Sequence, residues 1–100
     1  MADKHAYLIM AHRDFDMLVT LLRLIDHPNN DIYLHIDRRV KFIDYPRLYN
    51  AVEHASLRIY NEIRIHWSGF SQVKCELFLI KEAIKHHYLY YHLLSGSDLP

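Results

Sequence analysis

The chain has 100 residues, of which 51% are hydrophobic and 24% are charged. That length suits one small domain, and that apolar share is enough to bury a core, which excludes a disordered or fibrous chain. Twelve basic residues balance twelve acidic ones, so no net field attracts a nucleic acid or an anionic membrane surface.

The chain is expected to be cytoplasmic, with peripheral attachment at the inner membrane as the alternative for a longer form of the protein. The single cysteine, Cys75, lacks a partner for a disulfide or a zinc ribbon, which fits a reducing compartment. The longest apolar run, residues 6–11, is far shorter than the roughly 20 residues of a spanning helix. A turn-like string over 95–100 follows an apolar run and predicts truncation at the C-terminus.

The first two elements are expected to be a strand and a helix. Residues 6–11 form an unbroken apolar run, which is typical of a strand buried on both faces. Leucine side chains then recur from Leu18 at helical spacing as far as Ile25. This pattern predicts an amphipathic helix that ends near Asp26.

The middle of the chain continues the alternation. His-Pro-Asn-Asn at 27–30 is a helix stop, because proline disfavours the helical region for the residue before it. Residues 31–36 are rich in branched and aromatic side chains and predict a second strand. A short helix opened by Pro46 is predicted within 45–54, and a third strand is predicted over 57–60.

The last third of the chain predicts a loop, a long helix and a strand. The loop covers 67–71 and the final strand covers 90–94. Apolar residues of the long helix step by four, three and four, and this set is Val73, Leu77, Ile80 and Ile84. Strands that alternate with helices predict an α/β fold with a mostly parallel sheet, here as one domain over 1–100.

Asp14-Phe15-Asp16 has the Asp-x-Asp spacing that many nucleotide-sugar transferases use to hold a divalent cation. It stands at a predicted helix start, where carboxylates cap free amides and complement the helix dipole, so capping is the favoured interpretation. The chain has no Gly-x-Gly-x-x-Gly or Gly-x4-Gly-Lys-Ser/Thr motif. Rossmann dehydrogenases and P-loop nucleotidases are therefore disfavoured.

The histidines and serines near the C-terminus do not indicate a metal centre or a hydrolase. His86, His87 and His92 lack a second cysteine or a carboxylate at ligand spacing, so surface and strand positions are favoured over a metal site. Ser95 and Ser97 are not in a Gly-x-Ser-x-Gly motif, which leaves a catalytic triad without its usual anchor.

Polar residues follow the predicted strands at the edge where ligands bind in parallel sheets. The Asp37 carboxylate could accept a hydrogen bond from a ribose hydroxyl, and the guanidinium groups of Arg38 and Arg39 could hold a diphosphate. The alternative is that the three charges form a solvated turn. Trp67 is either a flat surface on which a ligand stacks or an aromatic residue buried at a loop corner. Asp98 is either a carboxylate at a reactive centre or an ordinary turn residue. The residues by themselves leave these alternatives open.

Four segments taken together resemble one family. They are His-Ala-Tyr-Leu-Ile-Met-Ala-His at 5–12, the stretch 21–37 that ends in Tyr-Leu-His-Ile-Asp, Trp-Ser-Gly-Phe-Ser at 67–71, and Leu-Leu-Ser-Gly-Ser-Asp-Leu-Pro at 93–100. In this order and at these separations they resemble the core-2/I-branching N-acetylglucosaminyltransferase family, glycosyltransferase family 14, which also includes peptide O-xylosyltransferases. The likeness spans about the first third of a usual family domain.

The resemblance implies a GT-A-like fold, a UDP-sugar donor and inverting transfer to an acceptor hydroxyl of a glycan or surface polysaccharide, with no metal or other cofactor. It implies that the donor pocket is lined by Met10, His12, Asp37, Arg39, Trp67 and Asp98. The family's catalytic glutamate would lie beyond residue 100, so the isolated chain is expected to be inactive.

Two departures from the family pattern bear on this expectation. The family usually has Trp-Gly-Gly where this chain has Ser68 in the middle, which restricts the backbone if φ is positive there. Secretory animal members carry several cysteines and a membrane anchor, so a bacterial-type cytoplasmic member is the better likeness. The alternative hypothesis is a non-catalytic module of α/β fold that binds a uridine nucleotide or a protein.

Overall fold

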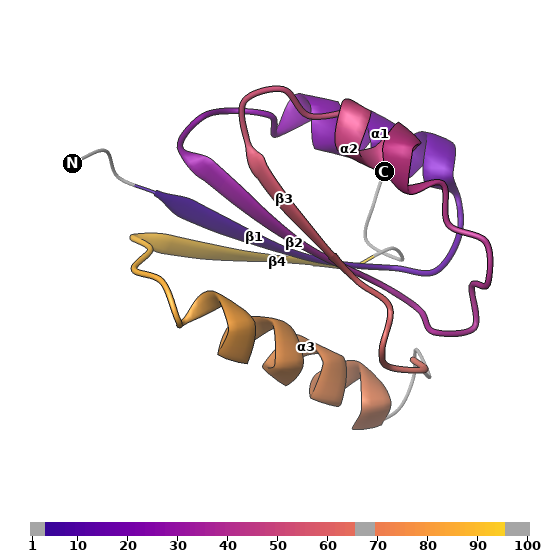
Figure 1. Cartoon of the computed structure of the whole chain (residues 1–100). Helices are drawn as coiled ribbons and strands as arrows, with labels where there is room; N and C mark the ends of the chain where they lie inside the picture. Colours follow the sequence, from indigo (N-terminus) through magenta and orange to yellow (C-terminus); the bar gives the residue numbers. More distant parts are fainter. Residues whose placement is uncertain (1–3, 66–69, 96–100) are drawn as a thin grey trace.

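A computed structural model of the chain describes residues 4–65 and 70–95. Four parallel strands form one sheet in the order β3-β2-β1-β4 (Figure 1). The strands are β1 (His5–Ala11), β2 (Asn30–Ile36), β3 (Ser56–Tyr60) and β4 (Tyr90–Ser95). The α/β fold and the parallel sheet expected from the sequence are confirmed, as are the four strands to within two residues at each end.

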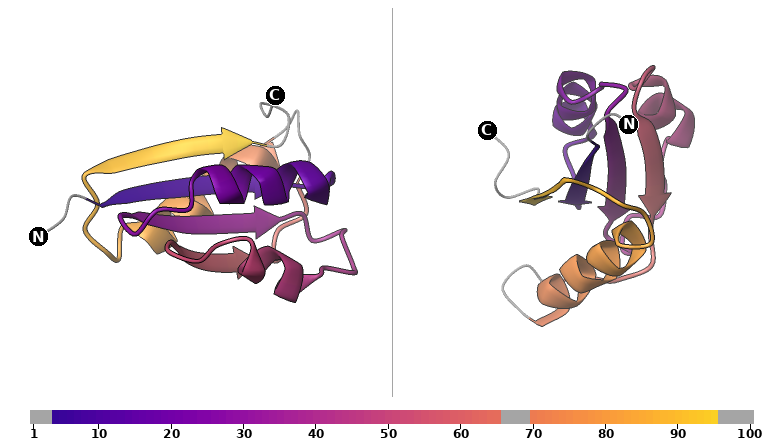
Figure 2. Two further views of the ribbon diagram at one scale, coloured as in Figure 1. Left: turned by 90° about the horizontal axis from the view of Figure 1, so that it is seen from above. Right: turned by 90° about the vertical axis from the view of Figure 1, so that its left-hand side faces the viewer.

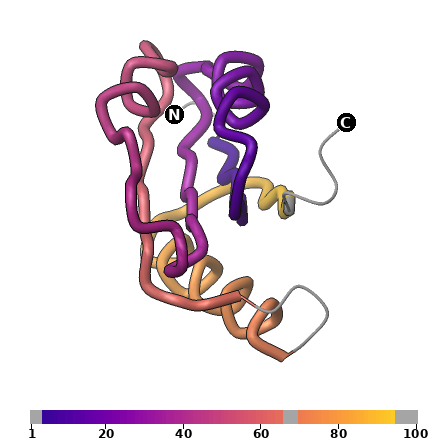
Figure 3. The backbone as a smooth tube through the Cα atoms, turned by 90° about the vertical axis from the view of Figure 1, so that its right-hand side faces the viewer, coloured from indigo at the N-terminus to yellow at the C-terminus, as the bar shows by residue number. Residues whose placement is uncertain are grey.

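Helices cover both faces of the sheet (Figure 2). Helices α1 (Phe15–Leu24) and α2 (Tyr45–Asn50) lie on one face, and α3 (Phe70–Ala83) lies on the other, as the tube in Figure 3 also shows. The chain crosses the sheet from β1 to β3 in one direction and then returns past β1 to β4. Crossovers of one hand place helices on opposite faces when the direction reverses, which explains the layering.

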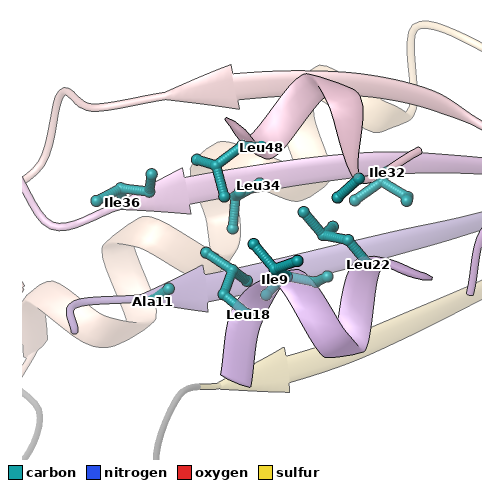
Figure 4. Close-up of a cluster of buried hydrophobic side chains, with 10 residues drawn as sticks. Ile9, Ala11, Leu18, Leu22, Ile32, Leu34, Ile36 and Leu48 are labelled. Carbon is teal, nitrogen blue, oxygen red and sulfur yellow. The ribbon is translucent and has the colours of Figure 1, made fainter. Parts of the chain in front are cut away.

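The core between the sheet and α1 forms where the sequence predicts it (Figure 4). Leu18 and Leu22 are fully buried against Ile9 of β1 and the apolar side chains of β2. Asp14 caps α1, since its Oδ1 accepts a hydrogen bond from the Met17 amide at 3.1 Å. The capping interpretation of Asp14 is therefore confirmed.

The short helix predicted within 45–54 is confirmed as α2, which ends at Asn50. Asp26, at the end of the preceding α1 segment, accepts hydrogen bonds from the amides of Glu53, His54 and Ala55, each at 2.8 Å. In a longer helix these three amides would donate to helix carbonyls. Because they donate to Asp26 instead, the helix stops and the chain turns towards β3. A long-range contact therefore sets the end of this helix.

Helix α3 buries a different face from the one predicted. The four apolar residues predicted to form its buried face, Val73, Leu77, Ile80 and Ile84, are between 37% and 60% exposed. Cys75, Leu79 and Ala83 face the sheet instead and are fully buried. The two sets lie about 130° apart at about 100° per residue. Helix α3 also begins at Phe70, inside the predicted loop 67–71, of which 67–69 lie outside the described residues.

The packing of α3 has a physical reason. Cys75 and Ala83 are small, so the helix can approach Ala6 and Leu8 of β1 closely while Leu79 fills the space between them. The helix is apolar on two sides, and hydrophobic spacing alone does not say which side meets the sheet. None of the helices within 4–65 and 70–95 is long and apolar enough to cross a membrane.

Replacing leucines on the two sides of α3 tests this packing. Leu79→Ala should lower the free energy of unfolding by about 2 to 5 kcal/mol, because it leaves a cavity against the sheet. Leu77→Ala should lower it by about 1 kcal/mol or less, because Leu77 is 58% exposed. Urea unfolding followed by circular dichroism measures both, and an equal loss in the two variants would contradict this packing.

Candidate functional site

The carboxyl ends of the strands meet at one edge of the sheet, and the strand order reverses there between β1 and β4. Ligands of open parallel sheets bind at such a reversal, outside the carboxyl ends of the strands. The loop after β1 starts at His12 and the loop after β2 starts at Asp37. The Asp37 amide donates to the Ala11 carbonyl at 2.9 Å, so the two loop starts are held side by side.

Asp37 and Arg39 form an ion pair at this edge. The Asp37 side chain has no exposed surface, whereas that of Arg39 is 49% exposed. Arg39 Nη2 donates to Asp37 Oδ2 at 2.8 Å, and the Arg39 amide donates to Oδ1 at 2.9 Å. Arg39 Nη2 also donates to the Ile65 carbonyl at 2.8 Å, which fixes the guanidinium against the chain that follows β3. The carboxylate thus orients the arginine, and the arginine faces outward.

The charges at this edge shift one another's protonation. Burial would raise the pKa of Asp37, but the hydrogen bonds and the positive charge of Arg39 outweigh it and hold this pKa below its usual value. The same carboxylate raises the pKa of Arg39. Burial and the charge of Arg13 lower the pKa of His12, while Asp37 opposes that shift. The edge therefore carries an ion pair of aspartate and arginine beside a histidine whose pKa is lowered.

The structure describes four of the six residues expected at the donor pocket. Met10 is fully buried on the α3 side of β1, one residue before the end of that strand, and it is paired in register with His35 of β2. His12, Asp37 and Arg39 follow on the adjoining loops. Trp67 and Asp98 lie outside the described residues.

Sequence reasoning missed the segment 61–65, which follows β3 and lies over the end of β2. Asn61 Nδ2 donates to the carbonyls of Ile36 and Asp37 at 3.0 and 2.9 Å. The amides of Glu62 and Ile63 both donate to Nε2 of His35, at 3.2 and 3.0 Å. The one sequence signal for this contact is Asn61 itself, an asparagine just past a strand end, whose side chain can donate to carbonyls at the end of a neighbouring strand.

His35 is a buried histidine that is held neutral. It has no exposed surface, and burial lowers its pKa to about 4 despite the nearby charge of Asp37. Because Nε2 accepts two amide hydrogens, the ring proton sits on Nδ1, which has no hydrogen-bond partner among the residues that the structure describes. The ring also packs edge-on against Phe78 of α3. His35 therefore joins β2, the 61–65 segment and α3.

The C-terminal histidines occupy surface and strand positions, as expected. His86 and His87 are exposed after α3, and His92 stacks on His5 across the β1–β4 pair with a nitrogen separation of 3.0 Å. Within 4–65 and 70–95, no three His, Cys, Asp or Glu side chains are grouped to hold a metal ion. Cys75 is buried, and burial raises the pKa of its thiol to about 12.

A parallel α/β sheet with a polar carboxyl edge and a reversal beside its first strand is consistent with a GT-A-like, Rossmann-like architecture. The sequence pattern of the family described as Branch, Core-2/I-Branching enzyme, matches residues 5–100. The chain belongs to this family.

A curated relative supports the same family. The chain is 22% identical over 104 aligned residues to a pig (Sus scrofa) protein, a "Probable beta-1,3-galactosyl-O-glycosyl-glycoprotein beta-1,6-N-acetylglucosaminyltransferase 7". The match covers 95% of this chain and 23% of that protein. The chain therefore spans about a quarter of the length of this relative.

The neutral state of His35 predicts a pH-dependent stability. Its pKa is about 4 in the folded chain and 6.5 without the shift, so the unfolded chain binds more protons between these values. The free energy of unfolding should fall as the pH drops from about 6.5 towards about 4, by up to about 1.4 kcal/mol per pH unit. Urea unfolding at several pH values measures the slope.

The matched variant is His35→Gln, whose side-chain carbonyl can still accept from the Glu62 and Ile63 amides but cannot take up a proton. It should show a shallower slope in the same window, with the remainder due to His12, whose pKa is also lowered. Asp26 and Asp37 have lowered pKa values, so they change the free energy of unfolding only below about pH 4, outside the range in which His35 acts. An unchanged slope in His35→Gln would overturn the assignment.

Proposed function

We propose that this chain is the uridine-binding part of an inverting, metal-independent glycosyltransferase. The enzyme would move a sugar, N-acetylglucosamine, from a UDP-sugar to a hydroxyl of a glycan or surface polysaccharide. The observation that carries the proposal is the family match over residues 5–100. The name of the pig relative, a β-1,6-N-acetylglucosaminyltransferase, supports the choice of sugar.

Within this proposal the nucleotide lies at the β1 and β2 ends of the carboxyl edge. The donor-binding residues are Met10, His12, Asp37, Arg39, Trp67 and Asp98, as the resemblance implies. Arg39 is the group that meets the nucleotide, since its side chain is half exposed and carries the positive charge that a diphosphate needs. Asp37 is a positioning residue, because its buried carboxylate holds Arg39 through three nitrogen atoms.

The chemistry of inverting transfer needs two further parts. A carboxylate base takes the proton of the acceptor hydroxyl, and fixed positive charge stabilises the diphosphate as it leaves. The resemblance assigns the base to a glutamate with no counterpart in residues 1–100. We therefore propose that the chain binds the donor and that transfer requires further residues.

Removing the Asp37 carboxylate should weaken the binding of UDP. Asp37→Ala frees Arg39 from its fixed position, and UDP affinity should fall at least about fivefold, which corresponds to about 1 kcal/mol or more. Binding to the unaltered chain should not change when magnesium is added or chelated. Isothermal titration of the purified chain with UDP measures both effects.

Asp31→Ala is the matched control. Asp31 is also a buried aspartate of β2, paired with Lys4, but it lies at the amino end of the strand. This variant should bind UDP as the unaltered chain does, with circular dichroism to show that each protein is folded. Unchanged UDP affinity in Asp37→Ala, or no UDP binding by the folded chain, would count against the proposed donor site.

A further inference from the structure

A basic pocket lies beside the proposed nucleotide site, at the ends of β2 and β3. It has a volume of about 310 Å³ and is lined by Arg38, Arg39, Lys41 and Arg64. Three of these residues follow β2 and the fourth follows β3. The strand order puts the pocket on the side of β2 away from the reversal between β1 and β4.

Hydrogen bonds hold together the two chain segments that carry the four cations of the pocket. The Arg38 amide donates to the Ile63 carbonyl at 3.1 Å, and Arg39 Nη2 donates to the Ile65 carbonyl at 2.8 Å. These two bonds hold the chain on both sides of Arg64 against the turn after β2. The Val40 amide closes that turn by donating to the Asp37 carbonyl at 2.9 Å, which leads into Lys41.

The positive charge of the pocket is mostly uncompensated. Arg39 is paired with Asp37, but in the part of the chain that the structure describes no carboxylate pairs with Arg38, Lys41 or Arg64. The nearest acidic residue after Lys41 is Asp44, whose carboxylate accepts from an amide as the cap of α2. Three exposed cations that have no paired anion among the described residues therefore line one hollow, which favours the binding of an anion there.

We propose that this pocket binds a phosphate or diphosphate group. Guanidinium groups hold phosphate oxygens with paired hydrogen bonds, and the lysine adds a mobile positive charge. The volume lies at the lower end of the range for small-molecule sites, which suits a compact anion. The pocket shares Arg39 with the proposed donor site, but Arg38, Lys41 and Arg64 lie outside that site, so the inference goes beyond the proposed function and does not need a uridine to be present.

The test is a titration of the chain with inorganic pyrophosphate at constant ionic strength. The double variant Lys41→Ala/Arg64→Ala should weaken pyrophosphate binding at least tenfold. The matched control, Arg23→Ala/Lys81→Ala, removes the same two charges from exposed positions in the last turns of α1 and α3 and should bind as the unaltered chain does. An equal loss in both double variants, no loss in either, or equal displacement of pyrophosphate by chloride or acetate would overturn the proposal.

Competition identifies the source of the phosphate. Displacement of pyrophosphate by UDP but not by uridine, together with weaker UDP binding in Lys41→Ala/Arg64→Ala, supports the site with the donor's diphosphate as its ligand. UDP and pyrophosphate bound at the same time support it with a phosphate from a second ligand. UDP binding that fails in Asp37→Ala but not in Lys41→Ala/Arg64→Ala reports on the donor site alone, so the two proposals fail separately.

Discussion

The buried carboxylate of Asp37 is the constraint on which the carboxyl edge of the sheet depends. A charge with no exposed surface costs several kcal/mol unless a partner neutralises it and hydrogen bonds satisfy its oxygens. Arg39 supplies both, which makes the chain turn sharply after β2 and bring the arginine back over the aspartate. The same guanidinium bonds Ile65, so the charge on β2 also fixes the chain that leaves β3.

The α3 side of β2 carries polar groups where a fully buried strand usually carries apolar ones. The segment 61–65 satisfies Nε2 of His35 through two amides and the carbonyls of Ile36 and Asp37 through Asn61. Because the segment 61–65 covers these groups in place of water, Arg64 lies close to the residues that follow β2. One edge therefore combines a neutral histidine, an ion pair and a cluster of cations, and both proposed ligands are anions that such an edge favours.

Local patterns were enough where one signal dominates. The apolar run of β1 needs no other information, and Asp14 was correctly taken as a cap because it stands directly before an amphipathic helix. The prediction was wrong for α3, since apolar residues occupy two sides of that helix and the small Cys75 and Ala83 select the side that meets the sheet. The sequence placed α2 within 45–54 but not its last residue, because the contact with Asp26 that ends the helix spans more than 25 residues.

The sequence by itself determined the alternation of strands and helices, the parallel sheet and the family, because hydrophobic period and short motifs are local properties. It also placed Asp37 and Arg39 together, since they are two residues apart. Only the tertiary structure decided that Asp37 is buried and acts through Arg39, that His35 is neutral, and that Arg64 joins Arg38 and Lys41. These features depend on which strands become neighbours and which segment covers their ends, and residues far apart in the chain carry no local sign of that.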